Sequence, residues 1–586
     1  MSDDVALSVR PSAGNYRCIW RMPVDLVGRD PSEEVSSGAN DEEQVSIEEP
    51  QAAEEPQTTE EQTGKDKTKS FPGTIELQPN RIPQGTLYEW LPAHTFNPET
   101  AEMQYALPQL FKLPRLHGFL EGNSFEVLLL DVTITVWSLG QSDISAAAAC
   151  TGIDLLSGLA DEAEPRFVGA EVQVTNLDAI CGYAPLAKTR FPNDPRARET
   201  SNKPQAGEEP LARNRRLARN RRLTGNRRLT GNRRLTGNRR LTGKPQAGEE
   251  PQAAEWGAVA NGKSTQSWSD EEAELTLDFR ASYSVFDPYY FRVAFAPVVA
   301  INIPTGLDLR GWIDRWANPL KMIVSVATGR EEVITHLSLY LQNKEDRGPG
   351  DRIGVWGLGI TQEPFSSRQR AVNRARSSFL IPQDHSSLLG LIRKWCEQLD
   401  DHNPILETYN PVMLRGNQHP RARYLMLIPC LEGLYGYQTR DKFEKKCEDR
   451  IKDRDKLIAR LTALAADEKV EFDSKDLKFV KDNISKRPPS DLSVALRKLF
   501  HQVNADNLLE KLKSTELIVG VDEEFNHEGQ IGRSLSQIRN DLAHGNKGYP
   551  AYALAEVSCI LHLIVRAQIL RTLEVSVEAQ ERALEM

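Results

Sequence analysis

The stretch LSQIRNDLAHG, residues 535–545, gives the strongest indication of fold and chemistry in this chain of 586 residues. Leu535, Ile538 and Leu542 recur at helical spacing and form one apolar stripe, which predicts a helix packed inside a bundle. Gly545 follows the last expected helical residue, and Pro550 precedes a second apolar run. The pattern therefore predicts a glycine-capped helix end, with the next helix covering residues 551–573.

Three polar residues at this helix end are candidate catalytic residues: Arg539, Asn540 and His544. Arginine is always charged and its donors fit phosphate, whereas histidine can accept and donate protons near neutral pH. Cleavage of RNA by its own 2′-hydroxyl requires proton transfer and charge stabilisation at phosphorus, with no metal or other cofactor. Arg539 and His544 lie about 140° apart around an ideal helix, so either the helix loosens before Gly545 or a second chain completes the site. Asn540 and His544 share one face.

Two competing motifs lack the local context that their chemistry needs. Arg330 and His336 have a similar spacing, but residues 333–341 alternate like a half-buried strand and offer no helix end. Residues 257–264, GAVANGKS, match a phosphate-binding loop, but a linker precedes them and no amphipathic helix opening follows. We therefore interpret residues 257–264 as a loop that leads into the next strand.

The arginine-to-histidine spacing, with a polar residue directly after the arginine, resembles the R-x4-6-H signature of HEPN ribonucleases. Residues 71–77 (FPGTIEL) and 85–90 (GTLYEW) precede a long strand-rich region and a helical last third. This order resembles the ApeA family of anti-phage defence proteins, which have a β-rich N-terminal domain and a C-terminal HEPN domain. The resemblance implies a helical bundle, a dimer that brings two motifs into one cleft, and cleavage of host RNA after phage infection.

Composition sets the expected environment of the chain. A net charge of −10 and a sequence pI of about 5.7 argue against a general nucleic-acid coat, so any RNA contact must be local. The seven cysteines are scattered, without a C-x-x-C pair, which favours reduced thiols over disulfides or zinc. The first residues have no signal-peptide pattern, and we find no apolar run long enough to span a bilayer. We expect a cytoplasmic protein without a membrane partner.

The predicted class is a multidomain α+β protein, with a β-rich region followed by an all-α bundle of the HEPN type. The expected parts are an N-terminal segment with a first strand (1–27), an acidic disordered linker (28–70), a β-rich sensor domain (71–382) and the helical domain (383–586). An arginine-rich loop, 200–256, interrupts the sensor domain with tandem NRRLTG repeats. These repeats either hold phosphate backbone weakly or form an inert loop, and the acidic linker is either a tether or an RNA mimic.

Within residues 71–382, strands are expected at 125–137, which is long enough to fold back once, and at 171–175, 274–279 and 289–295. Residues 307–326 predict one helix, with Trp312 and Trp316 packed on the sheets rather than stacked on a cofactor. Without a paired-carboxylate or nucleophile pattern, this region is assigned to sensing or binding, and it is the expected contact of a phage-derived activator.

The last third alternates between apolar stripes and helix breaks. One stripe begins at Leu388, and residues 488–491 (PPSD) predict a stop and an N-cap before residue 492. Residues 442–466 predict a charged helix whose apolar residues face inward: Ile451, Leu457, Ile458, Leu461 and Leu464. His501 and His527 are available as secondary site groups, although a structural or surface role is favoured for each.

These observations lead to one main hypothesis and one alternative. The main hypothesis is a metal-independent endoribonuclease, a homodimer or higher oligomer, that cuts RNA, with tRNA as the candidate substrate. His544 would move protons, Arg539 would hold the phosphate, and Asn540 would orient the histidine or the RNA. The products would carry a 2′,3′-cyclic phosphate or 3′-phosphate and a 5′-hydroxyl. The alternative is a non-catalytic receptor for a ligand or phage protein, whose bundle only dimerises.

Overall fold

The computed structural model describes residues 10–23, 68–90, 108–123, 125–138, 140–153, 155, 166–190, 257–287, 290–341, 352–409, 418–465, 474–487 and 492–585. Residues 28–67 of the predicted linker and the repeats 220–243 fall outside the described residues, as does the predicted cap at 488–491. The last three residues of the predicted linker, 68–70, belong to a strand, so the linker prediction is wrong there. The chain is an α+β protein, with strands before residue 358 and helices in its last third. Two compact units are distinguished: residues 184–262, and the rest of the chain.

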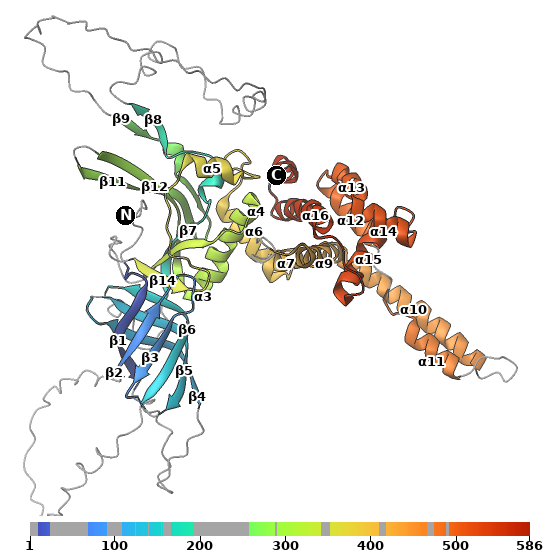
Figure 1. Cartoon of the computed structure of the whole chain (residues 1–586), viewed down its shortest axis with the longest axis horizontal. Helices are drawn as coiled ribbons and strands as arrows, with labels where there is room; N and C mark the ends of the chain where they lie inside the picture. The colour runs from blue at the N-terminus through green and yellow to red at the C-terminus, as the bar shows by residue number, and fades with distance from the viewer. Residues whose placement is uncertain are drawn as a thin grey trace, which may run out of the picture. The chain divides into compact units, whose positions relative to one another are not determined.

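A six-stranded antiparallel barrel forms the N-terminal part (Figure 1). The strands follow the order β6-β3-β2-β1-β4-β5, and β5 pairs with β6 to close the ring. Residues of alternating position fill the interior, including Trp20, Ile75 and Leu129, each at most 1% exposed. The strands are β1 (Gly14–Pro23), β2 (Thr68–Leu77), β3 (Gln84–Tyr88), β4 (Gln109–Leu120), β5 (Glu126–Ser138) and β6 (Gln141–Gly152).

The barrel confirms one strand prediction and corrects another. The predicted first strand is β1, which pairs with β2 along its whole length, so the N-terminal segment belongs to the barrel. The prediction that residues 125–137 fold back is wrong. β5 is one strand that pairs with β4 on one side and β6 on the other. Asp131, with φ of 52°, interrupts this pairing locally without turning the chain.

An open sheet continues from the barrel through the pairing of β14 with β6. Its order is β10-β11-β12-β7-β13-β14, and α4 packs against β7. The strands predicted at 171–175 and 333–341 are present, but the half-burial predicted for 333–341 is wrong. Every residue of β7 and nearly every residue of β13 is buried, because other parts of the chain cover both faces of these central strands. The strands are β7 (Phe167–Val174), β10 (Gln266–Ser269), β11 (Glu274–Asp287), β12 (Tyr290–Leu307), β13 (Ile334–Leu341) and β14 (Ile353–Gly357).

The helix predicted at 307–326 is a continuous helical run with a π-turn in its middle. α3 (Leu309–Trp312), the π-turn η6 (Ile313–Ala317) and α4 (Asn318–Thr328) follow one another. Trp312 is fully buried and donates a hydrogen bond to the carbonyl of Phe167 at 2.9 Å. The tryptophan therefore anchors the helix on the sheet, which confirms the core role predicted for it.

Two strands form the smaller compact unit. β8 (Leu186–Arg190) pairs antiparallel with β9 (Gly257–Ala260), and the segment between them contains the repeats. The P-loop-like residues run from β9 through a single 3-10 turn, Gly262–Ser264, into β10. The interpretation of residues 257–264 as a loop is therefore wrong for Gly257–Ala260, which form β9, and no α-helix N-terminus follows the glycines.

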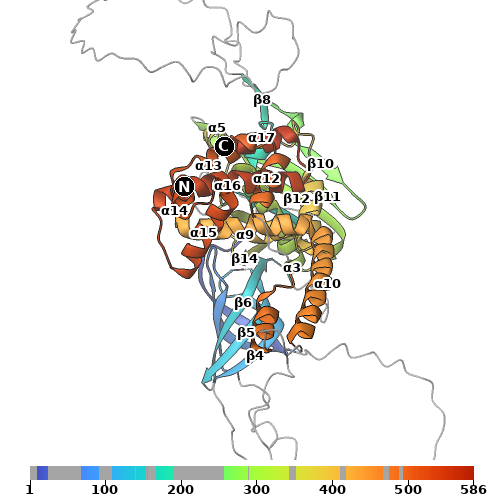
Figure 2. The same cartoon turned by 90° about the vertical axis from the view of Figure 1, so that its right-hand side faces the viewer.

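The last third is a helical bundle around α16 (Figure 2). α16 has the length and hydropathy of a membrane-spanning helix, but 78% of that apolar window is buried inside the structure. The expectation that no apolar run is long enough is therefore corrected, since this run is the core helix of the bundle. The helices are α6 (Leu388–Asp400), α7 (Pro404–Thr408), α9 (Pro420–Gln438), α10 (Arg440–Ala465), α11 (Ser474–Asn483), α12 (Leu492–Gln502), α13 (Asp506–Lys513), α14 (Glu516–Phe525), α15 (Ile531–His544), α16 (Ala551–Thr572) and α17 (Val577–Leu584); α1 (Asp178–Cys181) and α5 (Gln369–Ala375) precede them.

The sheet and the bundle share one hydrophobic core, so the expected boundary at residue 383 marks a change of secondary structure rather than a gap. Val172 of β7, Ile323 of α4 and Leu561 of α16 belong to the same buried cluster. Arg566 of α16, 2% exposed, crosses this junction and donates to the carbonyls of Val326 and Ala327 at 3.1 Å each. These are carbonyls of the last turn of α4, which have no partner within their own helix.

The inward packing predicted for the apolar residues of α10 is wrong for three of the five, while Ile458 and Leu461 are half-buried. Ile451, Leu457 and Leu464 are 38%, 43% and 45% exposed. α10 packs on α11 and on the end of α9, not in the bundle core. An apolar stripe indicates which face of a helix packs against its neighbours. It does not indicate how much of that face the neighbours cover.

Candidate active site at the end of helix α15

The predicted helix around residue 539 is α15, and its end has the predicted geometry. Leu535, Ile538 and Leu542 are each at most 2% exposed and form its buried stripe. Gly545 has φ of 73° and donates its N–H to the carbonyl of Asp541. Since a left-handed residue ends the helix here, His544 is its last residue and its side chain is exposed.

The three predicted site residues do not all meet within one chain. Arg539 lies 30% exposed on the side of α15 next to α9, where its Nη1 is 2.6 Å from Glu432 Oε2. Its Nε donates to Asn540 Oδ1 at 3.3 Å. Asn540 and His544 are both exposed, and among the described residues no hydrogen bond or ion pair joins Arg539 to His544. The structure thus places Arg539 beside Asn540 and against α9, whereas the side chain of His544 is exposed to solvent.

Glu432 is a site residue that sequence reasoning missed. It lies in α9, 107 residues before Arg539, and its carboxylate fixes one end of the guanidinium. An arginine has five N–H donors, and the described contacts engage only Nη1 and Nε. The Nη2 group has no hydrogen-bond partner among the described residues, so it could contact a phosphate while the carboxylate holds the side chain.

Helix α9 also braces the backbone of α15. Arg421 donates to the carbonyl of Leu542, an acceptor in the last turn that lacks an intrahelical partner. One turn further along α9, the buried hydroxyl of Tyr424 donates to the carbonyl of Leu535 at 2.8 Å. These two contacts fix α15, which ends at His544, against α9.

A second group of contacts orders the loop after Gly545. Asp541, 5% exposed, accepts hydrogen bonds from Tyr549 Oη at 2.7 Å and from Gln537 Nε2 at 3.0 Å. Burial, followed by the hydrogen bond to Asp541, raises the pKa of the Tyr549 hydroxyl well above its ordinary value. The tyrosine therefore stays protonated and donates to the carboxylate. Neither Asp541 nor Tyr549 was predicted from the sequence as a site residue. The position of Asp541 next to Leu542 of the apolar stripe could have indicated a buried carboxylate that needs a hydrogen-bond donor.

Lys547 lies three residues after His544, among aromatic side chains. Its Nζ is 5.7 Å from the ring centre of Phe525 and 5.4 Å from that of Tyr549, and it also pairs with Glu524. His527 stacks on Phe525 with ring centres 5.7 Å apart, and its Nδ1 lies 3.1 Å from Ser534 Oγ. This packing is consistent with the structural role favoured for His527.

The other candidate groups lie away from α15. His501 is exposed, and its Nδ1 is 3.2 Å from Asp506 Oδ2. His336, the rejected motif's histidine, is 1% exposed in β13, where burial and the nearby Arg10 and Arg352 lower its pKa to about 3. In the described parts of the chain, no cluster of three or more His, Cys, Asp or Glu side chains is arranged to hold a metal ion.

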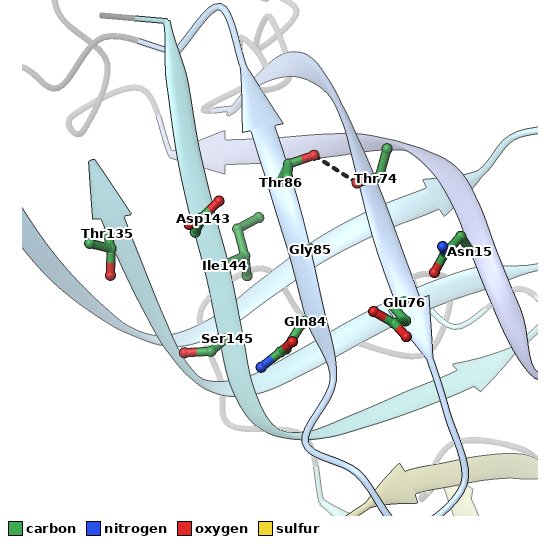
Figure 3. A pocket seen from close by; sticks show the side chains of 10 residues that line it. All are labelled: Asn15, Thr74, Glu76, Gln84, Gly85, Thr86, Thr135, Asp143, Ile144 and Ser145. Carbon is green, nitrogen blue, oxygen red and sulfur yellow. Dashed lines mark hydrogen bonds between the residues drawn. The ribbon is translucent and has the colours of Figure 1, made fainter. Parts of the chain in front are cut away.

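The barrel carries a polar groove of about 460 Å³ on its outer surface (Figure 3). Thr74 and Thr86, on adjacent strands, share a 2.7 Å hydrogen bond in it, and Glu76 and Asp143 supply carboxylates. The groove is hydrophilic because the alternate residues of these strands, such as Ile75, point into the barrel. Most of the side chains that line it are polar, and it has no nucleophile with an adjacent base.

No protein-family model, no curated protein and no solved structure matches this chain.

Proposed function

We propose that the chain is a metal-independent endoribonuclease of the HEPN type, acting in the cytoplasm in anti-phage defence, with tRNA as the candidate substrate. One observation carries the proposal: an exposed imidazole stands at a glycine-capped helix end, five residues after an arginine held in place by a carboxylate. The histidine can transfer the protons of 2′-hydroxyl attack, and the arginine can stabilise charge on the phosphorus.

The two groups point in different directions from α15, so the complete site needs a second copy of the chain. His544 of one copy would then face Arg539 of the other, with Asn540 orienting the histidine or the RNA. This arrangement agrees with the partial exposure of Arg539 and the full exposure of Asn540 and His544. A homodimer or higher oligomer is therefore part of the proposal.

Incubation of the purified protein with total RNA in EDTA tests this function. The wild type should cut RNA and leave 5′-hydroxyl ends, and His544→Ala and Arg539→Ala should each lower the rate by about 10²-fold or more. Thermal unfolding of both variants should match that of the wild type, because both side chains reach solvent. Undiminished cleavage by either variant would exclude the proposed chemistry.

A second candidate function is a receptor that does not cut RNA, and the barrel groove favours it. In that case a ligand or phage protein would bind along Thr74, Thr86 and Asp143, and the bundle would serve dimerisation. A wild-type protein that leaves RNA intact, but binds a phage protein in a way that Asp143→Ala weakens, would support the receptor.

A further inference from the structure

Helices α10 and α11 form a hairpin that is held together by arginines and leaves much of α10 exposed (Figure 1). Arg454 donates to the carbonyls of Ile484 at 2.9 Å and Lys481 at 2.8 Å, and Arg450 donates to that of Ser485 at 3.1 Å. These bonds satisfy carbonyls at and just after the end of α11. The hairpin thus has a defined geometry, with one side of α10 turned to α11 and the rest turned to solvent.

Charges on the solvent side of α10 are partly segregated. At about 100° per residue, six cations fall within an arc of about 120°, and every one of them is exposed. We call this set the basic strip: Lys442, Lys445, Lys446, Lys452, Lys456 and Arg460. Four carboxylates occupy a separate arc: Asp441, Glu444, Glu448 and Asp455. The strip is about 27 Å long, at about 1.5 Å of rise per residue.

Most of the basic strip is not neutralised by its neighbours. Asp449 and Asp453 lie inside the arc, each 3.9 Å from one lysine of the strip. The remaining cations have no carboxylate within 4.0 Å in the described part of the chain: Lys442, Lys445, Lys446 and Arg460. α10 carries nine Lys and Arg against six Asp and Glu, a net charge of +3, whereas the whole chain has −10. A local excess of cations on an acidic protein suits an anionic partner.

The layout of α10 favours a nucleic-acid backbone over a lipid surface. A helix that binds membranes buries an apolar face between its cations, with the charges at the edges of that face. In α10 the half-buried apolar residues Phe443, Ile458 and Leu461 lie on the side of Arg450 and Arg454, toward α11, and the exposed Leu457 and Leu464 lie at one edge of the basic strip. The centre of the basic strip is about 140° away from the half-buried residues. A row of exposed cations that has exposed apolar side chains, Leu457 and Leu464, along one edge only can contact phosphates without reading bases.

We propose that the basic strip of α10 binds the sugar–phosphate backbone of the RNA substrate without regard to its sequence. This inference rests on the proposed function, because it assigns the strip to the same RNA that α15 would cut. The strip would hold the RNA through several phosphates, and the site at His544 would act on one of them.

Binding of total tRNA to the His544→Ala protein, measured by fluorescence anisotropy over a range of salt concentrations, tests the proposal. In the strip variant, Lys442, Lys445, Lys446 and Arg460 are all changed to glutamine. The slope of log Kd against log salt should decrease by about 3, because each phosphate contact contributes about 0.7–0.9. Binding at 0.1 M salt should weaken about tenfold or more. Circular dichroism should be unchanged, since these side chains are exposed.

A matched control removes the same charge from the barrel. It changes four exposed cations to glutamine: Arg17, Lys69, Arg81 and Lys112. Its affinity for tRNA should stay close to that of the unmodified His544→Ala protein. An equal loss of affinity in both variants would overturn the proposal, because net charge alone would then explain binding. Unchanged binding by the strip variant would also overturn it.

The remaining outcomes separate this proposal from the proposed function and from a lipid partner. A wild-type protein that binds tRNA through the strip but cuts no RNA would contradict the nuclease and support the strip. A wild-type protein that cuts RNA, and whose KM stays the same when the four strip substitutions are made without His544→Ala, would contradict the strip alone. Co-sedimentation with phosphatidylserine vesicles that only the strip variant loses, with tRNA binding intact, would assign the strip to membranes and refute the proposal.

Discussion

Replacing Glu432 with alanine tests whether the carboxylate that holds Arg539 contributes to catalysis. The two side chains are 26% and 30% exposed, so water screens the 2.6 Å ion pair, and its loss should cost only about 1 kcal/mol of stability. The effect on cleavage should be larger than that figure suggests. Without the carboxylate, only the 3.3 Å contact to Asn540 orients the guanidinium. We expect kcat/KM to fall about tenfold, equal to about 1.4 kcal/mol of transition-state stabilisation.

The assay measures kcat/KM on a labelled RNA in EDTA, together with thermal unfolding. Glu432→Gln keeps an acceptor without the charge and should fall between the wild type and Glu432→Ala. Glu397→Ala is the control, since it removes a carboxylate that pairs with Lys394, also in α6, and should not affect cleavage. A Glu432→Ala protein as active as the wild type would refute the positioning role. A loss as large as that of Arg539→Ala would show that the carboxylate acts in the reaction itself.

Three further predictions concern the stability of the fold. Gly545→Ala should lower the free energy of unfolding, measured with urea, by about 1 kcal/mol, because φ of 73° disfavours a residue with a Cβ although no atom crowds the site. Gly548→Ala is the control, since Gly548 has no positive φ, and it should have little effect. Arg566→Met should cost about 2 kcal/mol of stability, because the carbonyl of Val326 would lose the guanidinium while that of Ala327 would keep the N–H of Ser378. Arg571→Met, on the exposed side of the same helix, should cost about 0.5 kcal/mol or less, and equal losses would contradict the clamp. The pKa of His336 is lowered in the folded state, so the unfolded chain binds more protons than the folded chain below about pH 6.5. The free energy of unfolding therefore decreases as the pH is lowered from about 6.5 toward 3. At pH 4.5 this histidine should contribute a loss of about 2–3 kcal/mol relative to pH 7, which His336→Leu should remove from the pH dependence of the urea midpoint.

Local patterns predicted the end of α15 well, because helix spacing and a glycine cap act over a few residues. The stripe of Leu535, Ile538 and Leu542 and the break at Gly545 are confirmed. The 140° separation also anticipated that Arg539 and His544 would not meet in one chain. Their chemical role remains a prediction.

Contacts between distant segments could not be predicted from one sequence. Nothing near Glu432 marks it as the partner of Arg539, since the pairing depends on how α9 crosses α15. The burial of β7 and β13 on both faces likewise depends on which elements cover the sheet. For α10 the sequence predicted too much burial, where for β13 it predicted too little. Ile451 and its neighbours form an apolar stripe that α11 covers only in part.

The clamp of Arg566 on α4 has a practical consequence for work with fragments of this chain. A truncated protein that starts at residue 383 would keep α16 but lose the two carbonyls that its buried guanidinium requires. It would also expose to water the apolar side chains that now meet α4 and β7. Such a fragment should aggregate or unfold, so an inactive preparation of it would say nothing about the chemistry of α15.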